Sequence, residues 1–195
     1  MMDLRLAQVI DRTEAEGPGQ RFAVWVQGCP IQCAGCCNPE MFPTKGGTPT
    51  TPEELAARAT ATPNIEGISL LGGEPFAQAE ACARFAGLVR EAGLSVMVFS
   101  GYTRAELTVR RDEPGVGALL DACDLLVDGR YERDNPEASR RWIGSKNQVM
   151  HFLSPRYTSS DPRFLGHNTA EIRLTRGQLT MNGWPALVPQ IRRTR

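Results

Sequence analysis

This sequence of 195 residues has few histidines, no long apolar segment and no excess of charge of either sign. Its two histidines, His151 and His167, exclude a histidine-rich metal site and leave few candidates for a histidine general base. The 22 basic and 22 acidic side chains cancel, which argues against a protein built around nucleic acid. Apolar runs such as Ala23–Val26 are only a few residues long, far short of a membrane span.

The first residues carry charges where a signal peptide needs an unbroken apolar segment. We therefore expect a cytoplasmic protein that does not associate with membranes. Thiols stay reduced in that compartment, so clustered cysteines more often bind metal or take part in chemistry than form disulfides.

Charge is nevertheless unevenly distributed along the chain. Residues 1–129 hold 10 basic and 17 acidic side chains, whereas residues 130–195 hold 12 and 5. Two interpretations stay open: chance segregation over one folded surface, or a basic end that attracts an acidic partner or cofactor.

The hydrophobic pattern alternates between strands and helices. Strands are predicted at Leu4–Ile10, Phe22–Val26, Gly67–Leu71, Ser95–Phe99 and Leu125–Val127. Helices are predicted from the cap Thr51, at Phe76–Ala92, at Thr103–Val109 and at Gly117–Ala122. Repeated strand–helix units imply an α/β fold with a parallel sheet.

The last part of the chain has a different character. Residues 154–167 have the composition of a connecting loop, and residues 171–181 alternate polar and apolar side chains around Arg176-Gly177, which predicts a β-hairpin. We expect a core domain over residues 1–150 and an extension over residues 151–195, with the hairpin added at the edge of the domain.

Four of the six cysteines lie within nine residues, in the spacing C-x3-C-x2-C followed by one more cysteine: Cys29, Cys33, Cys36 and Cys37. A structural zinc site usually combines cysteine pairs from separated stretches, whereas all four are in one loop here. An iron–sulfur cluster fits better, because one compact loop can ligate three irons and leave the fourth open. Cys82 and Cys123 each stand alone and are expected to be buried as small apolar residues.

The cysteine loop, followed by Gly72-Gly73-Glu74-Pro75 after the next predicted strand, resembles the radical S-adenosylmethionine (SAM) superfamily. Within it, the loop from Trp25 to Glu40 resembles that of the anaerobic ribonucleotide reductase activating proteins, a glycyl-radical activase family. Residues 100–103, 125–131 and 141–148 resemble later motifs of that family in the same order. Cys37 stands where the family often has an aromatic residue, and the extension passes the family's usual end.

The resemblance implies a partial (βα) barrel of the radical SAM type, with an open parallel sheet and its helices outside. It implies one 4Fe–4S cluster held by Cys29, Cys33 and Cys36, with SAM at the open iron. The residues expected to contact SAM are, beside the cluster, Gly35, Cys36 and Cys37; at the methionine end, Gly72, Gly73 and Glu74; and at the ribose or adenine, Ser100, Tyr102 and Asp128. The chemistry is then carried by the cofactors, and no side chain is expected to act as a general base.

The implied function is reductive cleavage of SAM to a 5′-deoxyadenosyl radical, which takes hydrogen from a glycine of a large glycyl-radical enzyme. The implied electron donor is an external protein such as flavodoxin or ferredoxin. An alternative is a biosynthetic radical SAM enzyme that acts directly on a peptide or small molecule. A zinc or iron–sulfur interaction module would leave Gly72–Glu74 without a role.

Overall fold

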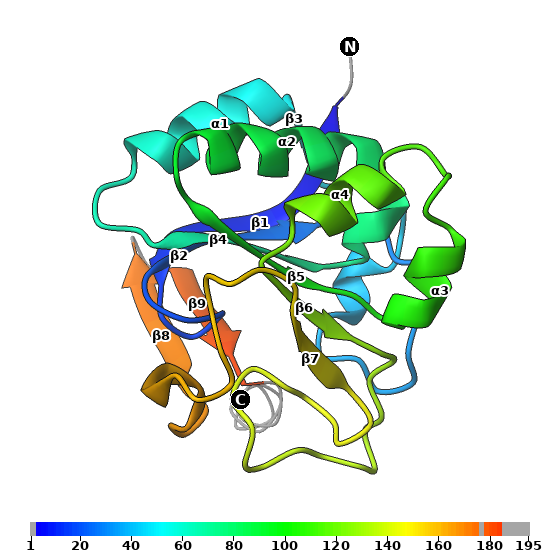
Figure 1. Ribbon diagram of the computed structural model, residues 1–195, viewed down its shortest axis with the longest axis vertical. Coiled ribbons are helices and arrows are strands. Elements are labelled where there is room, and N and C mark those ends of the chain that lie inside the picture. Colours follow the sequence, from blue (N-terminus) through cyan, green and yellow to red (C-terminus); the bar gives the residue numbers. More distant parts are fainter. Residues whose placement is uncertain (1–2, 176–177, 185–195) are drawn as a thin grey trace.

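The computed structural model describes residues 3–175 and 178–184, which form a mixed α/β fold (Figure 1). A seven-stranded open sheet has the order β3-β1-β2-β4-β5-β6-β7, and β8 and β9 form a separate two-stranded sheet. The strands are β1 (Leu4–Thr13), β2 (Arg21–Val26), β3 (Thr48–Thr50), β4 (Gly67–Gly72), β5 (Ser95–Phe99), β6 (Leu125–Asp128), β7 (Val149–Phe152), β8 (Ala170–Thr175) and β9 (Gln178–Gly183). The helices are α1 (Pro52–Ala61), α2 (Ala79–Glu91), α3 (Arg104–Val109) and α4 (Val116–Ala122).

The predicted elements are confirmed, but the sheet is not wholly parallel. Strands β2, β4, β5 and β6 run parallel, whereas β1, β3 and β7 pair antiparallel at the two sides. Only a short connection separates β1 from β2, and a parallel pair would need a crossover of a dozen residues or more. The predicted hairpin exists as β8 and β9, although its turn, Arg176-Gly177, lies outside the described residues.

Helix ends follow the local sequence. Thr51 caps α1 through a reciprocal capping box with Glu54, as its hydroxyl predicted, and Thr103 caps α3 in the same way. The helix predicted from Phe76 begins at Ala79, because the preceding 3-10 turn, Pro75–Gln78, is capped by the Glu74 side chain. Strands β3 and β7 were not predicted, since both are short and half exposed.

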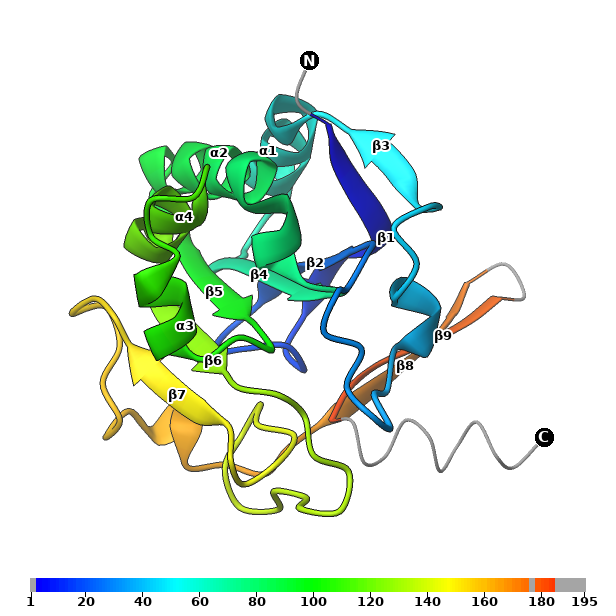
Figure 2. The ribbon, with the colours of Figure 1, turned by 90° about the vertical axis from the view of Figure 1, so that its right-hand side faces the viewer.

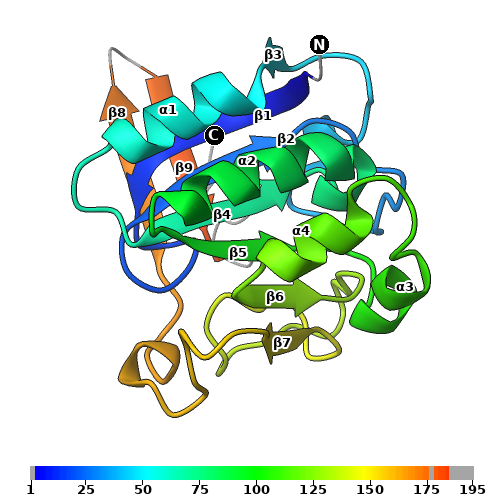
Figure 3. The same ribbon diagram turned by 45° about the horizontal axis from the view of Figure 1, so that its top comes forward.

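The two faces of the large sheet are covered differently (Figures 2 and 3). Helices α1, α2 and α4 cover one face, where strand residues such as Val24, Leu70 and Val98 are fully buried with helix residues such as Phe85 and Leu119. The alternate residues of the same strands point to the opposite face. There they meet loops and the C-terminal extension instead of helices, in clusters built on Trp25, Met97, Leu125, Val127 and Trp142.

The extension crosses this second face before it reaches the hairpin. Phe164 of the extension packs edge-on against Trp142, Phe152 and Tyr157, with ring centroids 5.1 to 6.0 Å apart. Aromatic contacts of this kind add to the burial of apolar area. The segment that follows β7 is therefore part of the hydrophobic core rather than a free tail.

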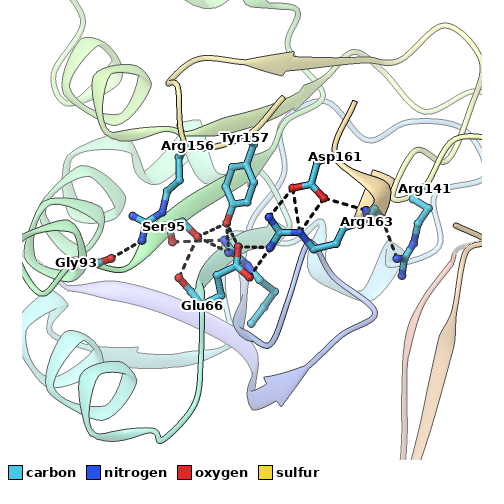
Figure 4. Close-up of polar contacts among 9 residues, drawn as sticks. Glu66, Gly93, Ser95, Arg141, Arg156, Tyr157, Asp161 and Arg163 are labelled. Carbon is cyan, nitrogen blue, oxygen red and sulfur yellow. Dashed lines mark hydrogen bonds and ion pairs between the residues drawn. The ribbon is translucent and has the colours of Figure 1, made fainter. Parts of the chain in front are cut away.

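A polar cluster fixes the same segment to the amino-terminal ends of β4 and β5 (Figure 4). The Tyr157 hydroxyl lies 2.5 Å from a Glu66 carboxylate oxygen and 2.8 Å from the Ser95 hydroxyl, and Arg163 pairs with Glu66 at 2.7 Å. The fully buried Arg21 guanidinium bonds to Ser95 and to the carbonyl of Ile68, and burial lowers the pKa of Arg21. The polar groups of this cluster can be buried because each of them forms hydrogen bonds with the others.

No helix among residues 3–175 and 178–184 is long and apolar enough to cross a membrane.

Removal of the Tyr157 hydroxyl by Tyr157→Phe is expected to lower the free energy of unfolding by about 1–2 kcal/mol, because buried hydrogen-bond partners lose a contact. Urea unfolding measures the loss. The neighbouring exposed change Thr158→Ala serves as the control and is expected to have little effect. Equal stability of Tyr157→Phe and the wild type would contradict the role given to this cluster.

Candidate functional site

A pocket opens beside the carboxyl ends of β2, β4 and β5, which is where parallel sheets usually bind ligands. Its lining combines the cysteine loop, the glycine-rich turn after β4, the end of β5 and parts of the extension. The predicted site residues that line it are Cys29, Cys33, Cys36, Cys37, Gly72, Gly73, Glu74 and Ser100. The structure thus brings together residues that are up to 71 positions apart in the chain.

The parallel pairing of β2 with β4 brings the two motifs together. Val26 pairs with Gly72 at the end of the ladder, and the backbone continues it with bonds from Gly73 N to Val26 O (2.8 Å) and from Glu74 N to Gly28 O (2.9 Å). A Cβ atom at Gly73 would lie 2.3 Å from the carbonyl oxygen of Gly28, and one at Gly72 would lie 2.6 Å from Trp25 Cβ. Glycine is required at both positions because the backbones of these two segments are in direct contact.

Backbone hydrogen bonds join the two ends of the cysteine loop and form a turn within it. Gly28 N and Cys29 N donate to the carbonyls of Met41 and Phe42, and Cys36 N donates to Cys33 O at 3.1 Å. Gly35, inside that turn, has a φ of 79°. The guanidinium of Arg133 covers Gly35, where a Cβ atom would lie 2.2 Å from Arg133 Nε. Only glycine fits both the backbone conformation and this contact.

The four thiols of the loop are partly exposed, and none forms a disulfide. A hydrogen bond from the Cys37 thiol lowers the pKa of Cys36 to about 7, while that bond and burial raise the pKa of Cys37. Burial raises the pKa of Cys29 and of Cys33. Of the four thiols, Cys36 therefore loses its proton most readily, and the thiolate is the form that binds metal.

The donor set fits an iron–sulfur cluster. Cys29, Cys33 and Cys36 line one pocket, and cysteine thiolates are the usual ligands of such clusters. Within the described part of the chain, no three histidine, cysteine or acidic side chains stand in the arrangement that holds a metal ion.

The Glu74 carboxyl group is buried and bound by this chain's own donors. It accepts bonds from Phe76 N (3.0 Å), Gly101 N (2.8 Å) and the Ser100 hydroxyl (3.0 Å), and burial raises the pKa of Glu74 to about 7. These bonds link the end of β4 to the end of β5. The Glu74 side chain therefore holds together the strand ends that line the pocket, beside Gly72 and Gly73.

The remaining predicted residues lie apart from this lining. Gly35 is under Arg133, and Tyr102 packs between the guanidinium groups of Arg110 and Arg130, 4.4 and 5.8 Å from its ring centroid. Asp128 accepts from Arg104 N and lines a shallow second depression with His151. Cys82 and Cys123 are buried as expected, and burial raises the pKa of both thiols.

Several lining residues could not be found from the sequence. Gln8 and Glu16 come from β1 and the β1–β2 connection, and Asn182 and Trp184 come from the extension. None belongs to a motif, and only the folded chain brings them together. Glu16 is buried, and this burial raises the pKa of its carboxyl group to about 7, although hydrogen bonds from Asn182 and Gly183 oppose the shift.

Known proteins resemble this chain over most of its length. Residues 15–151 match the family model described as a 4Fe-4S single cluster domain. The chain is 31% identical to the anaerobic ribonucleoside-triphosphate reductase-activating protein of Salmonella typhimurium over 147 residues, which cover 70% of this chain and 91% of that protein. The protein of the same name from Escherichia coli strain K12 is 32% identical, with the same coverage. That of Enterobacteria phage T4 is 29% identical over 69% of this chain and 85% of its own length.

Gly73→Ala is expected to lower the free energy of unfolding by about 2 kcal/mol, because its methyl group would collide with backbone. Gly87→Ala in α2 is the matched control. A Cβ atom there meets nothing within 4 Å, so the better helix propensity of alanine is expected to stabilise the protein by about 0.5–1 kcal/mol. Thermal and urea unfolding measure both changes, and equal effects of the two substitutions would contradict the close approach of the two motifs.

Glu16→Gln is expected to reduce the pH dependence of stability. Burial raises the folded-state pKa of Glu16 from 4.5 to about 7, so its contribution is fully present below pH 4.5 and is lost as the pH rises through 7. Glutamine stays neutral and keeps an oxygen for Asn182 and Gly183. Relative to the wild type, the variant should gain on the order of 2 kcal/mol between pH 5 and pH 8. If the free energies of unfolding of the wild type and the variant changed equally with pH over this range, Glu16 would ionise normally. The raised pKa of Glu74 affects both proteins equally and does not contribute to the difference.

Proposed function

Because the chain belongs to the family of anaerobic ribonucleoside-triphosphate reductase-activating proteins and carries its 4Fe-4S domain, we propose that the pocket beside β2, β4 and β5 is its active site. The chain is a radical SAM enzyme whose cofactors are one 4Fe–4S cluster and SAM. Its protein substrate is a glycyl-radical reductase of the anaerobic ribonucleotide reductase type. The single observation that supports this site most strongly is the convergence of Cys29, Cys33 and Cys36 with Gly72 and Gly73 on one pocket.

When bound, the reduced cluster supplies the electron that cleaves SAM to methionine and a 5′-deoxyadenosyl radical, which takes a hydrogen atom from a glycine of the reductase. In our proposal Cys29, Cys33 and Cys36 hold the cluster. Cys37 is a neighbour that donates a hydrogen bond to Cys36 and is not a ligand. Gly72 and Gly73 offer their backbone to the methionine end of SAM, since both line the pocket and carry no side chain.

The other lining residues of this chain protect the reaction space. Trp25, Leu71 and Phe99 form an apolar wall on the face of the sheet that has no helices, and Met41 packs with them. Such a wall excludes water from a site in which reactive species form. The arrangement supports a partial barrel of the radical SAM type, with the helices outside and the cofactors inside. In this assignment residues 1–150 are the core domain.

Two positive side chains beside the cysteine loop support an external, acidic electron donor such as flavodoxin or ferredoxin. Arg133 covers Gly35 of the loop, and Arg130, which pairs with Glu106 at 2.7 Å, partly opposes the burial that raises the pKa of Cys33. Both come from the basic part of the chain, after residue 129. Positive charge next to a redox centre raises the rate of encounter with acidic partners.

Anaerobic reconstitution of the wild type is expected to give a brown protein with about four irons per chain. Cys29→Ala, Cys33→Ala and Cys36→Ala should each lose this iron and the formation of 5′-deoxyadenosine from SAM and reductant. Cys37→Ala is the matched variant in the same loop and should keep about four irons. Loss of iron in Cys37→Ala would overturn the assignment of ligands, and a colourless protein with stoichiometric zinc would overturn the proposed function.

A further inference from the structure

The C-terminal extension has no counterpart in the family match, which ends at residue 151. The relatives from Salmonella typhimurium and Escherichia coli are matched over 91% of their own length by 70% of this chain. Handling of the shared cofactors therefore does not require the extension.

The hairpin of the extension is fixed to the body by its polar face. Asn182 donates to Thr13 Oγ1 (2.9 Å), Gly183 N donates to Glu16 (2.7 Å), and Glu14 N donates to Glu171 (2.8 Å). These contacts join β8 and β9 to the connection between β1 and β2. The end of β9 is thereby held at the pocket, where Met181, Asn182, Gly183 and Trp184 are lining residues.

The other face of the hairpin is apolar and points away from these contacts. Ile172 and Leu174 alternate along β8, and they pair directly with Met181 and Leu179 of β9, so the four side chains share one face. Ile172, Leu174 and Leu179 are 56%, 74% and 44% exposed. This apolar stripe (Ile172, Leu174, Leu179 and Met181) continues into the pocket, because Met181 lines it. An amphipathic hairpin that turns its polar face to the core leaves its apolar face for a partner.

Buried polar atoms without partners lie where the stripe meets the pocket. Asn182 is 4% exposed, yet its Oδ1 accepts no hydrogen bond from any described residue, and Gln8 Nε2 and Trp184 Nε1 likewise find no acceptor there. A buried donor or acceptor that stays unpaired is unfavourable, so a ligand that pairs with it gains affinity. Two donors and one acceptor complement a peptide group, whose carbonyl accepts and whose N–H donates. The flexible Met181 side chain at the same wall can move to admit a backbone.

We propose that the extension is the docking site for the partner polypeptide: the apolar stripe binds its side chains, and Gln8, Asn182 and Trp184 bind the backbone of its glycine segment. This inference rests on the proposed function and names the residues that select its protein substrate. A polypeptide fits better than a cofactor, because the stripe extends outside the pocket and the extension is absent from the family match.

The first test measures binding of the purified reductase of the same organism to the reconstituted protein by calorimetry. Leu174→Gln changes an exposed side chain of the stripe and is expected to weaken this binding about tenfold, without a change in stability. Val109→Gln is the matched control, since Val109 is 86% exposed at the end of α3, outside the stripe. Equal affinity of Leu174→Gln and Val109→Gln would overturn the proposal.

Two other occupants of the stripe give different results in the same experiment. A drop in the free energy of unfolding of Leu174→Gln would show that residues of this chain, such as 185–195, cover the stripe. Dissociation of a dimer by Leu174→Gln, with unchanged affinity for the reductase, would assign the stripe to contacts between copies of this chain. Either result overturns the proposal.

The second test observes the backbone contact directly. The chain has three tryptophans, so its ¹⁵N-labelled indole groups give few signals, and Trp184→Phe identifies that of Trp184. A capped peptide copied from the glycine segment of the reductase is expected to shift the Trp184 signal, and SAM alone is not. A shift with SAM alone, or with neither compound, overturns the proposal. Formation of 5′-deoxyadenosine by the wild type without reductase tests the proposed function separately.

Discussion

The site depends on one backbone constraint, the parallel pairing of β2 with β4. The ladder ends at Val26 and Gly72 and is extended by the bonds of Gly73 and Glu74 to the chain that leads into the cysteine loop. Two loops that follow parallel neighbouring strands must leave the sheet at the same edge. The thiols and the glycine-rich turn therefore line one pocket, and the absence of side chains at Gly72 and Gly73 allows the close approach of the two segments.

The two faces of the sheet have different roles. Helices cover one face with a continuous apolar core, and the other face is left for the pocket and for the extension. Buried charge is accommodated only where it has partners: Arg21 among hydroxyl and carbonyl groups, and Glu74 among three donors. The polar cluster around Tyr157 and Glu66 holds the extension across the second face (Figure 4), so that its hairpin arrives at the pocket. A segment that the family match does not include thus completes the wall of the site.

The raised pKa values of Glu16 and Glu74 follow from the same architecture. Both carboxyl groups are removed from water at the pocket, and burial is the largest cause of each shift. Glu74, which was predicted at the methionine end of SAM, lines the pocket, and its oxygens accept hydrogen bonds from Phe76, Ser100 and Gly101. The Glu74 carboxyl group thus links the ends of β4 and β5 at the pocket.

The sequence by itself determined the strands of the parallel sheet, the capped start at Thr51, the spacing of Cys29, Cys33 and Cys36, and the family to which these motifs belong. These features are local, because the periodicity of apolar residues, helix capping and the spacing of ligands each depend on residues that are close together in the sequence. Only the tertiary structure decided that Arg133 covers Gly35, that Tyr102 and Asp128 lie apart from the pocket, and that Gln8, Glu16, Asn182 and Trp184 line it. These contacts join residues as far apart as Gln8 and Trp184. Contacts of this kind depend on the side of the sheet to which the chain returns after many residues. No local sequence pattern encodes that path.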